Sequence, residues 1–174
     1  GQDGVPFYGN PREVLKSVCQ RMSDSGFKAV VAVEMEFFLT ELKKHLSQIP
    51  RPARSPESGQ RDNEGHLYSL TSLDDYNSFF QEISAVAEKQ NIPIYTAISE
   101  LSPGQFEINL HHVPDPLNAC DDAIMLKRII RNIANRHKME ATFMPKIFPD
   151  HPGNGMHVHL RLLDTKGKNV FQGR

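Results

Sequence analysis

Two histidines and a glycine loop stand together in the stretch 151–162, which reads HPGNGMHVHLRL. Gly153 and Gly155 predict a tight loop whose backbone can come close to a bound group. Apolar and polar residues then alternate, which is the period of a half-buried strand. The polar face of that strand carries His157, His159 and Arg161. Histidines at this spacing are also common on exposed strands, so this stretch alone does not identify a ligand site.

A pair of carboxylates interrupts another stretch, FKAVVAVEMEFFLT, at residues 27–40. The composition predicts a strand, and Glu34 and Glu36, two positions apart, then share one face. An edge strand with a solvated face is one interpretation. Such faces usually mix acids with Thr, Lys and Ser, whereas here the neighbours are apolar. A cation between the two carboxylates is the alternative.

Two further acids flank a predicted turn. The stretch 92–112 predicts two strands separated by Ser102-Pro103-Gly104, with Glu100 at the end of the first and Glu107 within the second. The turn can bring Glu100 near Glu107 although seven residues separate them. A surface position beside the turn is the other interpretation of Glu100.

Without a counter-charge, these carboxylates would repel one another if they lay close together. On one curved sheet, four carboxylates would repel by roughly 3 to 4 kcal/mol per pair at 4–6 Å and an effective dielectric constant near 20. Raised pKa values, basic partners or bound cations would relieve this repulsion. Because basic residues are scarce on these faces, we favour cations. Carboxylates with one imidazole suit Mg²⁺ or Mn²⁺ better than Zn²⁺, and a set of five ligands suits two ions, which typically serve phosphoryl chemistry. The set is Glu34, Glu36, Glu100, Glu107 and His157.

The elements that must position these residues predict an α+β fold, a curved antiparallel sheet with flanking helices. An Asn10-Pro11 start predicts a helix up to Gly26, and Asp115-Pro116 predicts one through about Lys138. A third helix is predicted from a Ser72/Asp75 capping box to about residue 90. We expect strands at 27–40, 92–112, 141–147 and 156–162. The segment 47–66, rich in Pro, Gly and Arg, is predicted to be an exposed, mobile loop whose arginines are solvated.

Composition narrows the classes of function. The 174 residues are 39% hydrophobic and 24% charged, with a formal net charge of −1. This balance gives no electrostatic footprint for nucleic acid or an anionic membrane. The sequence has no apolar run long enough for a membrane span and no signal peptide pattern. We therefore expect a cytoplasmic protein without nucleic-acid or membrane partners.

Four ordered motifs carry a resemblance to a known family. They are the E-x-E of Glu34 and Glu36, ELSPGQFE at 100–107, ATFMPK at 141–146 and GNGMHVH at 153–159. Together they resemble the catalytic domain of glutamine synthetase, and in detail the γ-glutamylpolyamine synthetase branch. The resemblance implies that residues 1–174 are the N-terminal portion of such a domain, a piece of a longer chain.

The family resemblance implies an ATP-dependent ligase that forms γ-glutamyl phosphate from glutamate and joins it to ammonia or an amine. By motif, Glu36, Glu100 and Glu107 would hold one Mg²⁺ or Mn²⁺, and Glu34 and His157 the second. The remaining motif positions imply that His159 and Arg161 lie at the nucleotide and Gly153 at the amino-acid end of the substrate. A ring-shaped homo-oligomer is implied as the assembly of the full-length parent.

Two residues depart from the family pattern and leave other functions open. Arg161 stands where many members have serine, and Pro152 where the housekeeping enzyme has asparagine. The family's later arginines and its remaining glutamate ligand would lie beyond Arg174, so we expect this chain to be catalytically inactive alone. A catalytically silent, glutamine synthetase-like scaffold is the second hypothesis, which the intact acids disfavour. A related ligase joining glutamate to cysteine, or a guanidine phosphotransferase, fits the motifs less well.

Overall fold

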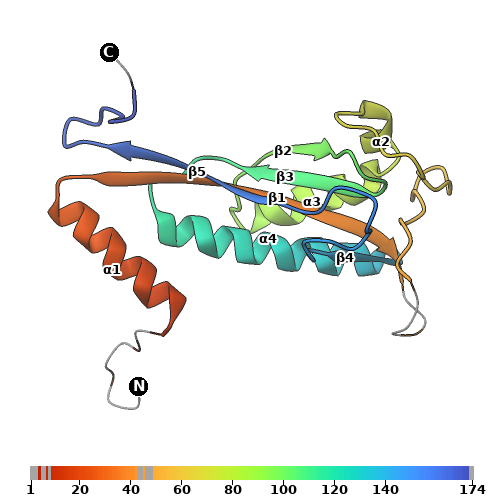
Figure 1. Ribbon diagram of the computed structural model, residues 1–174, viewed down its shortest axis with the longest axis horizontal. Helices are drawn as coiled ribbons and strands as arrows, with labels where there is room; N and C mark the ends of the chain where they lie inside the picture. Colours follow the sequence, from red (N-terminus) through yellow and green to blue (C-terminus); the bar gives the residue numbers. More distant parts are fainter. Residues whose placement is uncertain (1–3, 5–6, 8, 43–44, 46–48, 173–174) are drawn as a thin grey trace.

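The computed structural model describes residues 4, 7, 9–42, 45 and 49–172. Within this part of the chain, four helices and five strands form the α+β fold with an antiparallel sheet that the sequence predicts (Figure 1). In chain order these elements are α1 (Pro11–Asp24), β1 (Lys28–Glu41), α2 (Leu70–Asp74), α3 (Asn77–Lys89), β2 (Ile94–Ser99), β3 (Gln105–Leu110), α4 (Pro116–Arg136), β4 (Met139–Thr142) and β5 (Met156–Leu163).

The long strand β1 organises the sheet. It pairs with β3 between Glu34↔Asn109 and Phe38↔Gln105, and β2 continues the sheet beyond β3. Glu34 is also paired with His157 of β5. Because a strand has only two edges, β3 and β5 must lie on opposite edges of β1. The β5 edge of β1 then continues with β4, from Phe38↔Thr142 onward.

Helices α3 and α4 cover one face of this sheet (Figure 1), and the main core lies between them and the sheet. Phe37 of β1 is fully buried there and contacts the rings of Phe79 and Phe106. Because side chains alternate along a strand, burying Phe37 on the helix side turns its neighbour Glu36 to the opposite face. The core therefore fixes which face carries the acids.

The predicted helix beginning at Ser72 is wrong in its start and its continuity. It is two helices, α2 and α3, and the cap of α2 is Ser69, whose side chain accepts a hydrogen bond from the backbone N–H of Ser72. At the break, Ser55 donates its hydroxyl hydrogen to the carbonyl oxygen of Asp75. Tyr76 is buried and donates to the carbonyl oxygen of Ala53. Residues of the preceding loop thus contact the chain where α2 ends and α3 begins.

That loop, predicted to be exposed over 47–66, is in part packed; residues 47 and 48 lie outside the described part. Ala53 and Ser55 are buried, and Ala53 donates its N–H to the carbonyl oxygen of Leu39 at 2.9 Å. Arg61 forms an ion pair with Glu41 at the end of β1 instead of being simply solvated. The loop is held because it supplies backbone and ionic partners to β1.

The remaining two strands differ from the prediction in length and burial. The expected strand at 141–147 is β4, which begins at Met139 and ends at Thr142. Beyond its end, the side chain of Asn154 donates to the carbonyl oxygens of Thr142 and Met144. The apolar face of β5 is not half-buried as predicted. Its residues Met156, Val158 and Leu160 are 62%, 57% and 51% exposed, and none of them packs into a core cluster of the described residues.

Candidate metal centre

The five predicted ligands gather on one face of the sheet. Glu36 lies opposite Glu107 on β3, and Glu34 lies opposite His157 on β5. Paired residues of antiparallel strands point to the same face and lie close together. Glu100 joins them across the β2–β3 turn, where its N–H donates to the carbonyl oxygen of Gln105 at 2.9 Å.

Their ligand atoms form two overlapping groups. We define the first group as Glu36, Glu100 and Glu107 and the second group as Glu34, Glu107 and His157. Within each group the ligand atoms lie within 4.8 Å of one another. Glu107 belongs to both groups, whereas the resemblance places it only with the first ion. A carboxylate shared by both groups could contribute an oxygen to each of two ions.

The electrostatics of the cluster are unfavourable without a cation. Burial raises the pKa of Glu107, which is only 6% exposed, and the carboxylates of Glu34, Glu100 and Glu36 raise it further. Burial raises the pKa of Glu100 as well, with Glu36 adding to the shift. In the described part of the chain, no Lys or Arg forms an ion pair with Glu36, Glu100 or Glu107. Divalent cations would supply the missing charge.

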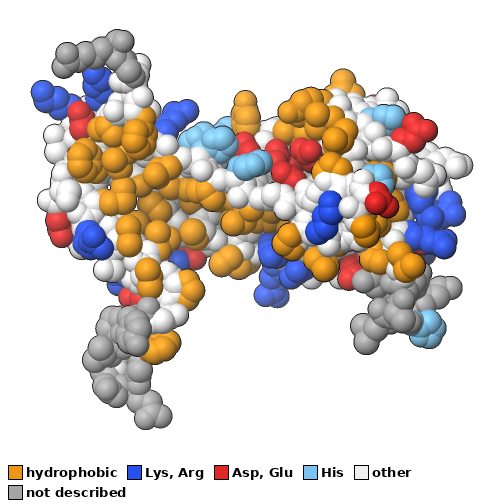
Figure 2. Space-filling view, in the orientation of Figure 1, with side chains coloured by type: hydrophobic (Ala, Val, Ile, Leu, Met, Phe, Trp, Pro, Cys, Tyr) orange, Lys and Arg blue, Asp and Glu red, His pale blue; other side chains and the backbone are white. Residues whose placement is uncertain are grey.

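Two histidines hold Glu34. The Nε2 of His159 lies 2.7 Å from Oε1 of Glu34, and the Nδ1 of His157 lies 3.2 Å from Oε2. A carboxylate only accepts hydrogen bonds, so Nε2 of His159 carries the proton in this contact. His159 therefore contacts a predicted ligand instead of standing apart from the cluster. Figure 2 shows acidic side chains and histidines gathered together on this face.

The predicted nucleotide contact Arg161 lies further along β5, opposite Val30 of β1. The ring of His112, which follows β3, lies 5.9 Å from that of His159. Burial, together with the charges of Arg161 and His159, lowers the pKa of His112. His112 therefore lies beside His159 on the histidine-bearing face of β5.

The glycine loop is held directly against the first group. Gly155 donates its N–H to Oε2 of Glu36 at 2.9 Å. Ser102, in the β2–β3 turn, donates to the carbonyl oxygen of Pro152. Sequence reasoning missed two polar residues here, Gln105 and Asn154, which connect this loop to the strands. Gln105 stands in the polar alternation of β3, and that alternation was the available signal.

Gly153→Ala is expected to destabilise the chain by roughly 1–3 kcal/mol, because a Cβ atom at this position would overlap the carbonyl oxygen of Pro145. Thermal unfolding of the variant and of wild type measures the change. Gly167→Ala is the control for glycine replacement in open space, although its positive φ of 76° adds backbone strain. Equal melting temperatures for wild type and Gly153→Ala would contradict the close packing of this loop.

The donor set fits hard divalent cations. Four carboxylates and one imidazole are the ligands that Mg²⁺ and Mn²⁺ accept, whereas structural Zn²⁺ sites use more Cys and His. Glu34 and Glu36 accept hydrogen bonds on defined oxygens, and such contacts would orient both carboxylates as ligands.

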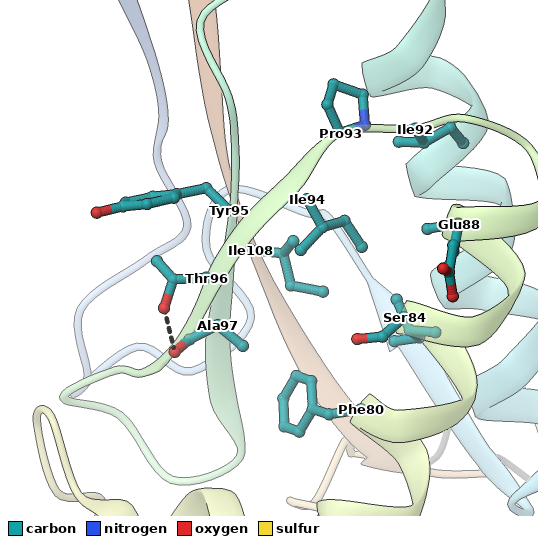
Figure 3. Close-up of a pocket in the computed structure, with 12 residues that line it drawn as sticks. Phe80, Ser84, Glu88, Ile92, Pro93, Ile94, Tyr95, Thr96, Ala97 and Ile108 are labelled. Carbon is teal, nitrogen blue, oxygen red and sulfur yellow. Dashed lines mark hydrogen bonds between the residues drawn. The ribbon is translucent and has the colours of Figure 1, made fainter.

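A separate groove of about 450 Å³ lies between α3 and β2 (Figure 3). Ile83, Ala87, Ile94 and Ile108 are among the residues that line it. Ile108 belongs to the apolar face of β3, which is opposite to the face of Glu107. This groove is therefore distinct from the carboxylate cluster.

Fold and cluster together define a class: an α+β domain whose antiparallel sheet presents a carboxylate-rich face. Comparison with known proteins gives the family. Residues 8–174 match the family model described as the glutamine synthetase catalytic domain. The chain belongs to the glutamine synthetase catalytic-domain family, as its motifs predict.

Individual relatives agree with this assignment. The chain is 41% identical over 170 residues to the γ-glutamylputrescine synthetase PuuA of Escherichia coli (strain K12), covering 98% of this chain and 36% of that protein. It is 34% identical to a glutamate–isopropylamine ligase of a Pseudomonas species, covering 97% and 36%. A solved structure of a GmaS/ADP complex matches with a TM-score of 0.81 at 32% identity, covering 98% and 37%.

The chain thus spans little more than a third of the length of the relatives it matches. A glutamine synthetase of Plasmodium falciparum, at 24% identity and a TM-score of 0.81, supports the fold alone. Among the described residues, no helix combines the length and apolar character needed to cross a bilayer.

Proposed function

We propose that this chain is the cation-binding portion of an ATP-dependent carboxylate–amine ligase that joins glutamate to ammonia or to a small amine. The observation that carries the proposal is the pair of overlapping ligand groups that share Glu107 on one sheet face. Membership of the glutamine synthetase family, with relatives named as ligases of putrescine and isopropylamine, supports the same reaction class.

In the proposed reaction, the γ-carboxylate of glutamate attacks the γ-phosphorus of ATP and releases ADP. The amine then attacks the acyl phosphate carbon and displaces inorganic phosphate, losing a proton as the amide forms. Two bound Mg²⁺ or Mn²⁺ ions would neutralise charge on the phosphate oxygens. Glu36, Glu100 and Glu107 would hold one ion, and Glu34, His157 and the shared Glu107 the other.

The residues of this chain would also orient the participants. His159 restricts the rotation of Glu34 through its 2.7 Å contact. The glycine loop around Gly153 lies beside Glu36, where we propose it contacts the amino-acid end of glutamate. Arg161, with His159, is proposed to contact the nucleotide. We expect the chain alone to be inactive and the full-length parent, a cytoplasmic homo-oligomer, to carry the activity.

The test is amine-dependent ADP release by the full-length protein with ATP, Mg²⁺ and glutamate. Ammonia, isopropylamine and putrescine are offered in turn, and we expect at least one to stimulate ADP release strictly in the presence of glutamate. The alternative is a silent scaffold, for which the departures at Pro152 and Arg161 leave room. Calorimetric titration of Mn²⁺ and ATP into the same protein separates the two hypotheses, because a scaffold binds neither ligand tightly.

A further inference from the structure

Gln105 is a buried amide placed between the glycine loop and the first group. It begins β3 directly after the turn and is 2% exposed. Its Nε2 lies 3.0 Å from Oε2 of Glu36, 3.0 Å from the carbonyl oxygen of Gly153 and 3.1 Å from Oδ1 of Asn154. Three oxygen acceptors surround this atom, so chemistry requires the nitrogen there and not the amide oxygen.

The amide oxygen of Gln105 differs from Nε2 in its surroundings. Oε1 of Gln105 is buried and has no hydrogen-bond partner among the residues that the structure describes. Leaving a buried acceptor unpaired typically costs about 1–3 kcal/mol. An apolar residue of the same size would avoid that cost, and it would also lose the contacts of Nε2. Locally unfavourable arrangements of this kind are expected at functional positions.

The contact with Gln105 orients the carboxylate of Glu36. Its Oε2 accepts two hydrogen bonds, from Gln105 Nε2 at 3.0 Å and from the N–H of Gly155 at 2.9 Å. These bonds occupy one carboxylate oxygen and fix the plane of the group. Oε1 of Glu36 forms neither bond, so it remains available to a cation held with Glu100 and Glu107.

We infer that Gln105 is a positioning residue, which selects the oxygen of Glu36 that binds the cation and ties the glycine loop to that carboxylate. This inference rests on the proposed cation site. Hydrogen-bond partners of metal ligands typically change metal affinity 10- to 100-fold when they are removed. We therefore expect a loss of roughly this size when Gln105 can no longer donate.

The experiment is calorimetric titration of MnCl₂ into the 174-residue chain. Gln105→Leu keeps much of the side-chain volume and removes the donor, and we expect its Kd for Mn²⁺ to rise about 10- to 100-fold. Gln105→Asn keeps the amide one methylene shorter, too far back to reach Glu36, and is expected to show the same direction of change. A melting curve of each variant reports folding, so the second variant keeps the test valid where the first does not fold.

Ser102→Ala is the matched control. Ser102 is 1% exposed and donates to the carbonyl oxygen of Pro152 in the glycine loop at 3.2 Å. Among the described residues, it forms no hydrogen bond to a carboxylate of the cluster. We expect a lower melting temperature and an unchanged Kd for Mn²⁺. Wild-type affinity in both Gln105 variants overturns the inference, and so does equal weakening in Ser102→Ala, which would reduce Gln105 to a loop anchor. Absence of Mn²⁺ binding by wild type overturns the cation site itself, a different result.

Discussion

Glu107→Gln is expected to raise the melting temperature of the metal-free chain at pH 7 and to abolish its stabilisation by Mn²⁺. The neutral amide keeps the shape of the carboxyl group but removes the charge that both ligand groups share. Without metal, that charge is buried among other carboxylates and opposes folding. With metal, the same charge is the shared ligand. One substitution therefore has opposite effects in the two conditions.

The pH dependence of this effect has a definite sign. The pKa of Glu107 is raised in the folded chain, so its favourable contribution is complete below its unfolded pKa, near 4.3, and is lost as the pH rises through the folded pKa. The difference in melting temperature between Glu107→Gln and wild type should thus be small at pH 4 and grow towards pH 7. A difference in melting temperature that stays constant from pH 4 to pH 7 would contradict the raised pKa of Glu107.

The expected Mn²⁺ effect is large enough to measure by thermal unfolding. One site at a hundredfold excess over Kd stabilises by about 2.7 kcal/mol, or roughly 5–10 °C at this chain length. Asp122→Asn is the control, because burial also raises the pKa of Asp122, which lies on α4 outside both ligand groups. It should keep the full Mn²⁺ shift. A wild-type shift in Glu107→Gln would exclude Glu107 as the shared ligand.

The positions of the acids could be predicted because strand periodicity is local. The alternation around Glu34 and Glu36 specifies their common face, and the core side chain Phe37 enforces it. The turn at Ser102–Gly104 likewise brings Glu100 to Glu107. These features need no knowledge of distant contacts. The common polar face of these acids could accordingly be predicted from the sequence.

The wrong predictions concern features that depend on contacts between residues distant in sequence. Nothing local to the 69–77 segment indicates that Ser55 and Ala53 accompany the end of α2. The exposure of the apolar face of β5 is likewise set by which elements cover it, and alternation alone cannot report that. Gln105 was visible as one polar residue among several, but its role follows from a loop that begins almost fifty residues later in the chain.

Glu34→Ala in the full-length protein is expected to lower amine-dependent ADP release by on the order of 10²- to 10³-fold, the loss typical when one element of charge stabilisation is removed. Glu34 is the carboxylate that both His157 and His159 contact. Alanine leaves these imidazoles without their acceptor and removes a ligand of the proposed second ion. Initial rates with saturating glutamate and Mg²⁺ measure the effect.

Glu41→Ala is the matched control on the same strand, since Glu41 pairs with Arg61 at the far end of β1 and takes no part in either ligand group. It removes the same charge and the two ion pairs with Arg54 and Arg61, so a lower melting temperature is expected with nearly wild-type ADP release. If Glu34→Ala retained wild-type turnover, the second ion would have no place in the reaction. Of the two residues, only Glu34 contacts the histidines beside the carboxylate cluster. If both variants lost activity equally, the loss would therefore reflect damage to the fold of β1 and not the loss of a ligand.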